Sequence, residues 1–200
     1  MVPIEVEVKF LNVDIEDIRK RLTDAGGELE QPMRVMRRDM LDHADNRYSK
    51  GHFSERLRIR DEGDKCTMTY KVHRDGSPYP IELETTIGSY DATKQLMEAI
   101  GLHSISYQES KRETWRLDDV EVVIDEWPWA KPYIEIEGES EPSIKAAAKK
   151  LGFDWKDAKF GSADTVYQAE YPKMTDKDSI GDVAEVRFDL PVPQYFKDRR

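Results

Sequence analysis

Apolar and charged residues alternate strictly near the start of the chain, in the segment IEVEVKF at residues 4–10. Successive side chains of a strand point to opposite faces, so this alternation predicts a strand with one apolar and one charged face. The charged face carries Glu5, Glu7 and Lys9. Such a face either meets solvent or holds a charged ligand. The charge pattern of the other strands helps to decide between these two possibilities.

At least five predicted strands share this design, and their charged faces repeat the same short units. The units R-x-R and E-x-E recur, whereas solvated strands usually mix Lys, Glu, Thr, Ser and Gln. The polar positions are Arg56, Arg58 and Arg60 in RLRIR, Thr67, Thr69 and Lys71 in TMTYKV, Glu82 and Glu84 in IELE, Arg112 and Asp125 in a hairpin at 110–127, and Glu135 and Glu137 in IEIE.

Three amphipathic helices are predicted between these strands. Asp14 is expected to cap a helix that ends near residues 26–27, and a helix beginning near Pro142 ends at Gly152. In the third helix, within residues 89–102, Leu96, Met97 and Ile100 are expected to point inward. Strands dominate and short turns join most neighbours, which predicts an α+β protein with a largely antiparallel sheet.

Composition limits the class of protein. The chain has 200 residues, of which 38% are hydrophobic and 36% charged, so it is expected to be globular. Its net charge of −10 argues against general nucleic-acid binding. No apolar stretch is long enough for a transmembrane helix, and the single cysteine, Cys66, has no disulfide partner within the chain. We therefore expect a cytoplasmic protein without a membrane or nucleic-acid partner, as a monomer or homodimer.

The length suits one large domain with an appendage. We expect a main domain over residues 1–172, followed by a polar appendage or tail at residues 173–200. One segment within the main domain has no clear pattern. It contains Arg38 and Lys50, for which a solvated loop is one interpretation.

The helices need apolar strand faces to pack on, and a curled sheet offers such faces on its outside. If the sheet closes in this way, its charged faces line the interior. A barrel of about eight strands is just wide enough for side chains or one small ligand. The pattern thus favours a closed eight-stranded antiparallel β-barrel, or tunnel, with helices packed on the outside. A charged structural barrel without a ligand is the alternative.

Charges in such an interior are costly unless they are paired, hydrated or bound to metal. Arginine and lysine suit phosphate oxygens, and carboxylates suit magnesium or manganese. A triphosphate with a divalent metal satisfies both groups at once. The cations are Lys9, Arg58, Arg60, Lys71 and Arg112, and the carboxylates are Glu5, Glu7, Asp125, Glu135 and Glu137.

These motifs, taken in order, resemble those of the CYTH superfamily, also called triphosphate tunnel metalloenzymes. The chain opens with EVEVK, which matches the N-terminal E-x-E-x-K signature. LRIR, TYK, ELE, the arginine of KRETW, the aspartate of VVID, and YIEIE then follow in the family's order, so the resemblance runs from residue 4 to about residue 170. Many relatives have a Leu-Gly pair where this chain has WPWAKPY, which leaves Lys131 as an extra cation.

The resemblance implies an eight-stranded tunnel that binds a triphosphate with Mg²⁺ or Mn²⁺. On the matching positions it implies catalytic roles for Lys9, Glu5 and Glu7, and phosphate binding by Lys9, Arg58, Arg60, Lys71 and Arg112. It implies metal binding by Glu5, Glu7, Asp125, Glu135 and Glu137. Glu82 and Glu84 match the central E-x-E, with either metal-water binding or orientation of the basic residues as their role.

The expected reaction is metal-assisted hydrolysis of inorganic tripolyphosphate or a small organic triphosphate, such as thiamine triphosphate or a nucleoside triphosphate. Lys9 is expected to clamp phosphate, with a role as base if neighbouring cations lower its pKa. The first alternative is a class IV adenylate cyclase, which converts ATP to cyclic AMP and pyrophosphate. The second is a module that binds polyphosphate or a nucleotide without turnover.

Overall fold

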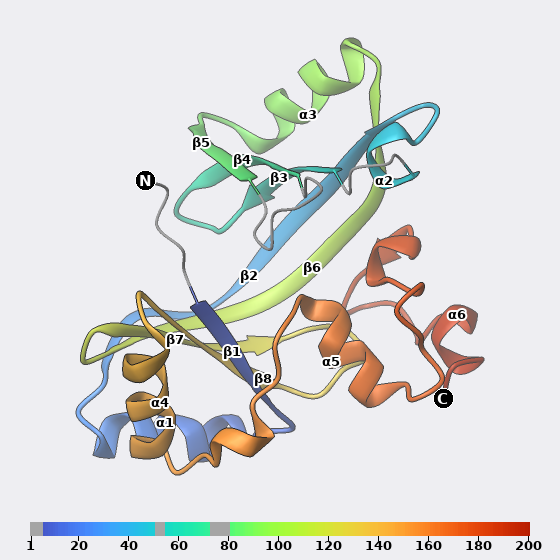
Figure 1. Cartoon of the computed structure of the whole chain (residues 1–200). Coiled ribbons are helices and arrows are strands. Elements are labelled where there is room, and N and C mark those ends of the chain that lie inside the picture. Colours follow the sequence, from blue (N-terminus) through green and yellow to red (C-terminus); the bar gives the residue numbers. More distant parts are fainter. Residues whose placement is uncertain (1–5, 51–54, 73–80) are drawn as a thin grey trace. The chain divides into compact units, whose positions relative to one another are not determined.

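The computed structural model describes residues 6–50, 55–72 and 81–200, so Glu5 lies outside the described residues. The nine strands of this part are β1 (Val6–Leu11), β2 (Glu28–His43), β3 (Glu55–Asp61), β4 (Cys66–Val72), β5 (Ile81–Ile87), β6 (Leu102–Leu117), β7 (Val120–Glu126), β8 (Tyr133–Gly138) and β9 (Glu185–Val186). Its α-helices are α1 (Ile15–Asp24), α2 (Arg47–Lys50), α3 (Tyr90–Ala99), α4 (Glu141–Lys150), α5 (Ala163–Glu170) and α6 (Gln194–Lys197). The predicted α+β class is confirmed (Figure 1).

All nine strands belong to one sheet, in the hydrogen-bonded order β1-β8-β7-β6-β2-β3-β4-β5. The pairs β1–β8, β7–β8, β6–β7, β2–β3, β3–β4 and β4–β5 are antiparallel, and β9 pairs with β6 in parallel. Within the described residues, no hydrogen-bonded pairing joins β5 to β1. The sequence predicts a closed barrel, and this closure is therefore not confirmed.

The chain divides into two compact units. Unit 1 comprises Met1–Arg34, Ser110–Ile180 and Phe188–Arg200, and unit 2 comprises Val35–Glu109 and Gly181–Arg187. The long strands β2 and β6 each contribute residues to both units. Most of residues 173–200, called the C-terminal segment below, thus belongs to the same unit as β1.

The two helices α1 and α4 cover the apolar face of the unit 1 sheet, as the sequence predicts (Figure 1). Ile18 and Leu22 of α1 pack with Val8 and Phe10 of β1, and all four side chains are almost fully buried. Asp14 caps α1 by accepting a hydrogen bond from the backbone N–H of Asp17. Burial on this face leaves the opposite face of the same strands to the charged residues.

Polar contacts interrupt the apolar face of unit 2, where α3 packs. Asp39 of β2 is fully buried and accepts hydrogen bonds from Tyr90, Lys94 and Ser104. These contacts compensate the buried charge. They also break the apolar alternation of β2, which is why the sequence did not predict this strand.

The orientation of α3 differs in part from the prediction. Met97 packs against the apolar cluster of unit 2, but Leu96 and Ile100 are 58% and 63% exposed. The helix meets the sheet mainly through the buried Tyr90 at its first turn. Because Asp39 takes part of the covered face, α3 has fewer apolar partners than its periodicity suggests.

The C-terminal segment is anchored within unit 1 by aromatic contacts. Phe196 of α6 is fully buried and stacks on Tyr167 and Tyr171, with ring centroids 4.9 and 4.8 Å apart. The Tyr171 hydroxyl donates to the carbonyl oxygen of Trp129, and the Trp129 indole N–H donates to that of Leu190. This segment therefore holds the loop that leads into β8.

No helix in the described part of the chain is long and apolar enough to cross a membrane.

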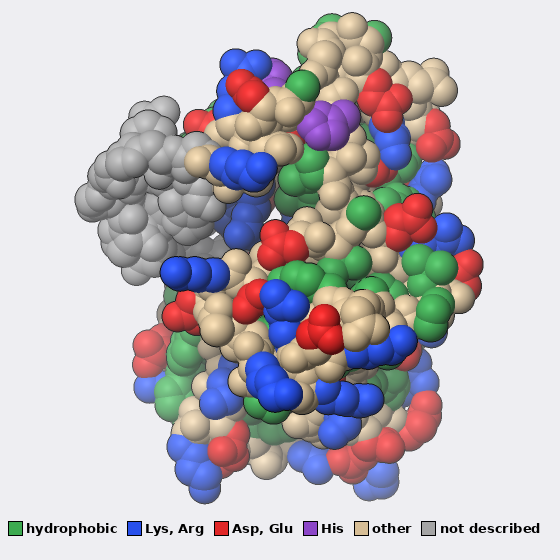
Figure 2. All heavy atoms as spheres, turned by 90° about the vertical axis from the view of Figure 1, so that its right-hand side faces the viewer, with side chains coloured by type: hydrophobic (Ala, Val, Ile, Leu, Met, Phe, Trp, Pro, Cys, Tyr) green, Lys and Arg blue, Asp and Glu red, His purple; other side chains and the backbone are tan. Residues whose placement is uncertain are grey.

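Charged side chains of both signs are interspersed with apolar ones over the face of the molecule that Figure 2 presents.

Candidate functional site

Lys9 lies at the centre of the charged face of unit 1. Its ammonium group is 2.8 Å from Glu7 and 3.0 Å from Glu135, and the residue is only 1% exposed. Glu7 is two residues away on β1, and Glu135 is the direct cross-strand partner of Lys9 on β8. The alternation of both strands thus brings these three predicted site residues together.

The ion pairs of this cluster shift the pKa values of Lys9 and Glu135 toward the charged forms of both groups. Burial alone would lower the pKa of Lys9, but Glu135 and Glu7 raise it above its ordinary value. Burial would likewise raise the pKa of Glu135, but Arg112 and Lys9 lower it. A protonated Lys9 suits a contact to phosphate better than the role of a general base.

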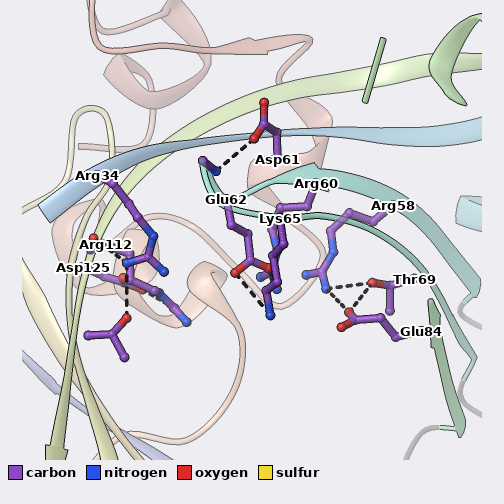
Figure 3. A network of polar contacts seen from close by, with 12 residues as sticks. Arg34, Arg58, Arg60, Asp61, Glu62, Lys65, Thr69, Glu84, Arg112 and Asp125 are labelled. Carbon is purple, nitrogen blue, oxygen red and sulfur yellow. Dashed lines mark hydrogen bonds and ion pairs between the residues drawn. The ribbon is translucent and has the colours of Figure 1, made fainter. Parts of the chain in front are cut away.

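Arg112 of β6 joins the same cluster from the other side. It forms a two-pronged pair with Asp125, at 2.8 and 2.6 Å, and contacts Glu135 at 2.9 Å. Despite its burial, these carboxylates raise the pKa of Arg112 well above its ordinary value. Arg34 of β2 donates to the Arg112 carbonyl oxygen (Figure 3). It also donates to the Thr114 hydroxyl. Because Asp125 accepts two hydrogen bonds from the Arg112 guanidinium, it orients this side chain in the structure.

Glu7 and Glu137 offer carboxylates for a divalent metal. They are direct partners across β1 and β8; Glu7 is exposed and Glu137 half-buried. Among the residues that the structure describes, no three His, Cys, Asp or Glu gather in a metal-binding arrangement. Magnesium commonly takes one or two carboxylates together with substrate phosphates and water, so the donors present fit it. The predicted Glu5 lies outside the described residues.

The charged face of unit 2 carries the arginines of the R-x-R unit. Arg58 donates to the Thr69 hydroxyl at 3.2 Å and lies 3.8 Å from Glu84, as Figure 3 shows. Arg60 pairs with Glu62 at 2.5 Å. Burial and the neighbouring Arg60 lower the pKa of Arg58 to about 10, so its guanidinium stays charged at neutral pH.

The central E-x-E unit contacts a lysine and a threonine on the neighbouring strand. Lys71 of β4 lies 3.0 Å from Glu82 of β5, its direct cross-strand partner. Glu84 accepts a hydrogen bond from Thr69 at 2.7 Å. Of the two roles considered for Glu82 and Glu84, these contacts favour orientation of the basic residues.

One further lysine lies beside Lys9, and the sequence pattern does not indicate it. Lys159 pairs with Lys9 through two backbone hydrogen bonds of 2.8 and 2.9 Å, as an isolated antiparallel bridge. Directly opposite residues point to the same face of a sheet, so the Lys159 side chain is on the charged side. A single bridge far along the chain leaves no periodic signal in the sequence.

A surface hollow of about 700 Å³ lies elsewhere, beside α4. Its lining includes Lys145, Phe153 and Trp155, and none of the predicted site residues. We therefore place the candidate site on the charged sheet faces rather than in this hollow.

Comparisons with known proteins agree with the fold. A model of the CYTH domain matches residues 3–164. The solved structure of a conserved hypothetical protein from Pyrococcus furiosus is 20% identical, with a TM-score of 0.63 over 82% of this chain and 99% of that one. A proposed adenylate cyclase from Vibrio parahaemolyticus is 13% identical, with a TM-score of 0.68 over 81% of this chain and 96% of that one.

A proposed adenylyl cyclase from Hippeastrum, for which a dominant triphosphatase activity is stated, is 15% identical. Its TM-score is 0.55 over 83% of this chain and 96% of that one. At these identities the likeness is one of fold alone. A search of curated protein sequences gives no match.

Proposed function

The chain belongs to the CYTH domain family, and on this premise we propose that it is a metal-dependent triphosphatase. Its substrate is inorganic tripolyphosphate or a small organic triphosphate. The observation that carries the proposal is the crowding of Arg58 and Arg60 on one strand face, where burial and mutual repulsion lower the pKa of Arg58. A polyanion bound to this face would relieve the repulsion and pair with both guanidinium groups.

The carboxylates Glu7 and Glu137 would hold a magnesium or manganese ion, together with Glu5. When bound, this ion supplies neutralisation of phosphate charge and activation of a water molecule. Mg²⁺ and Mn²⁺ both accept oxygen ligands of this kind. Asp125 and Glu135, already engaged by Arg112 and Lys9, act chiefly by orienting these cations.

The cations provide positioning and charge stabilisation, which are the main requirements of phosphoryl transfer. Lys9 and Arg112 stay protonated and stabilise the negative charge that develops on the phosphoryl oxygens. Arg58, Arg60 and Lys71 hold the remaining phosphate groups. No side-chain nucleophile is required, because water attacks the phosphorus.

Several broader predictions remain part of this proposal. They are closure of the sheet into a tunnel, a main domain at residues 1–172 with an appendage at residues 173–200, and activity in the cytoplasm on a small-molecule substrate. The fold alone supports hydrolysis and cyclisation equally. We favour hydrolysis, because water as nucleophile requires no adenine pocket.

Product analysis tests the proposal. The protein is incubated separately with tripolyphosphate, ATP and thiamine triphosphate, each with Mg²⁺ or Mn²⁺ and again with excess chelator. We expect metal-dependent release of phosphate that the chelator abolishes. Cyclic AMP with pyrophosphate would instead identify a cyclase, and neither product would identify a binding module. Full activity in metal-free buffer would refute the metal-dependent mechanism.

A further inference from the structure

Trp129 has a backbone conformation that a bulky residue rarely adopts. Its φ of 65° lies in the left-handed region, which glycine enters freely but which is sterically costly for a large side chain. Trp129 belongs to the loop 127–132, which joins β7 to β8. A strained residue of this kind persists only where its surroundings hold it, and such residues gather at functional sites.

Three hydrogen bonds hold the strained loop. The Tyr171 hydroxyl donates to the Trp129 carbonyl oxygen at 2.7 Å, and the Tyr167 hydroxyl donates to the Pro128 carbonyl oxygen at 2.6 Å. The Trp129 indole N–H donates to the Leu190 carbonyl oxygen at 2.7 Å. Both tyrosines are almost fully buried, so their bonds are shielded from water. Together these three hydrogen bonds form a clamp on the loop, called the loop clamp below.

The loop joins the two strand ends that carry the carboxylate partners of Arg112. Asp125 lies near the end of β7 and Glu135 near the start of β8. The Arg112 guanidinium reaches both carboxylates, at 2.6 and 2.9 Å. Tyr133, the first residue of β8, is the direct partner of Asp125. Because the turn of a hairpin sets the register of its strands, the conformation of this loop determines the spacing of the two carboxylates.

A purely structural role is the alternative, because buried tyrosine hydroxyls need acceptors in any protein. The strain at Trp129 argues against this alternative. A glycine at this position would adopt the same φ without strain, whereas the tryptophan needs the loop clamp to stay there. The conformation of the hairpin loop therefore depends on contacts from outside the hairpin.

We propose that the loop clamp positions the Arg112 guanidinium. The clamp fixes the loop, the loop fixes the spacing of the carboxylates at the ends of β7 and β8, and these carboxylates aim Arg112. Trp129, Tyr167 and Tyr171 are thus positioning residues rather than catalytic ones. Their effect on turnover rests on the proposed function, in which Arg112 stabilises the charge that develops on the phosphoryl oxygens.

Nuclear magnetic resonance of the guanidinium tests the positioning directly, without any substrate. The Arg112 Nε–H group donates to Asp125 at 2.8 Å, so its proton–nitrogen correlation signal reports on this contact. Loss of the signal in Arg112→Lys assigns it. Tyr171→Phe and Tyr167→Phe each remove one hydroxyl of the loop clamp and keep the ring. We expect each of them to shift or broaden the Arg112 signal.

Two control variants separate the loop clamp from the rest of unit 1. Tyr195→Phe also removes a tyrosine hydroxyl, but this hydroxyl donates to the Ser179 carbonyl oxygen, outside the loop. Ile18→Val trims the buried core between α1 and the sheet and so lowers the melting temperature. Neither control should move the Arg112 signal.

Steady-state kinetics with tripolyphosphate and Mg²⁺ give the functional readout. Tyr171→Phe should lower kcat about tenfold or more, because even a small misplacement of a catalytic group is this costly. The KM should stay within about twofold, because Arg58, Arg60 and Lys71 hold the remaining phosphate groups. In the Arg112→Lys background the same substitution should change kcat by less than about twofold, because the guanidinium through which it acts is gone.

The outcomes keep this inference distinct from the proposed function. An Arg112 signal that responds to both clamp variants and to neither control, in a protein that hydrolyses no triphosphate, would support the positioning and refute the triphosphatase. Hydrolysis by wild type, with Tyr167→Phe and Tyr171→Phe indistinguishable from Tyr195→Phe in signal and kcat, would overturn the positioning alone. An equal response of the signal to clamp variants and controls would overturn it too, as would an undiminished effect of Tyr171→Phe in the Arg112→Lys background.

Discussion

Lys9 and Glu135 are direct partners across β1 and β8, with 3.0 Å between the ammonium nitrogen and a carboxylate oxygen. Glu135 also contacts Arg112, so a single carboxylate links two buried cations. Removing one partner of a buried ion pair costs about 3–5 kcal/mol, because the remaining charge stays desolvated.

Glu135→Ala should lower the free energy of unfolding by about 3 kcal/mol, since it leaves two cations short of a carboxylate. Urea denaturation measures the change. Glu126→Ala is the control, because its pair with Lys111 is more exposed, at 3.8 Å, and should contribute less than about 1 kcal/mol. Equal effects of the two substitutions would contradict a buried network around Glu135.

The pH dependence of the free energy of unfolding should reflect the titration of Glu135. Its pKa is lowered in the folded protein, so its stabilising contribution is present above the unfolded value of about 4.3. This contribution is lost as the pH falls through the folded pKa. Urea midpoints measured from pH 6 down to pH 3 should therefore decline at the acidic end. Glu135→Gln should show a shallower decline, and an unchanged profile would contradict the assignment.

Arg58 and Glu137 should separate binding from turnover. Arg58→Ala should weaken tripolyphosphate binding about tenfold or more, because it removes charged hydrogen bonds to phosphate. Glu137→Ala should lower kcat by on the order of a hundredfold or more, since a catalytic metal is worth several kcal/mol in the transition state. Its metal-independent affinity for tripolyphosphate should persist.

Steady-state kinetics and calorimetry on both variants make this comparison. Glu139→Ala is the control for Glu137, because Glu139 follows β8 and is exposed. Wild-type turnover by Glu137→Ala at saturating metal would show that this strand does not hold the metal.

Phe196→Ala should destabilise the protein by about 3–5 kcal/mol, as truncation of a buried phenylalanine does. The substitution removes its stacking on Tyr167 and Tyr171. Denaturant midpoints measure the loss, with the exposed Lys197→Ala as control. A small change for Phe196→Ala would mean that the C-terminal segment does not contribute to the stability of unit 1.

Regular alternation made much of this fold predictable. In β1 and β8 every second residue enters one apolar core under α1 and α4, so the sequence pattern translates directly into two faces. The capping of α1 by Asp14 was equally readable, because it depends only on neighbouring residues. Contacts of this local kind leave a local signal in the sequence.

The strand β2 had no such signal, and Arg38 was left in an unassigned segment for that reason. Arg37 and Asp39 occupy the face where alternation demands apolar side chains, and their partners Asp61 and Tyr90 come from other elements. Closure of the sheet and the pairing of Lys9 with Lys159 likewise depend on residues far apart in the chain. Single-sequence periodicity carries no information on such pairings.

The pairing of β1 with β8 also bears on the order of folding during synthesis. The partner of Val6 in β8 is Gly138, and the chain between them takes on the order of ten seconds to synthesise. Until then Val8 and Phe10 lack the strand beside which they are buried. Unit 2 is almost continuous in sequence, whereas unit 1 needs residues from its first and last segments. We therefore expect unit 2 to fold first on the ribosome, while the apolar face of β1 stays available to chaperones until β8 has emerged.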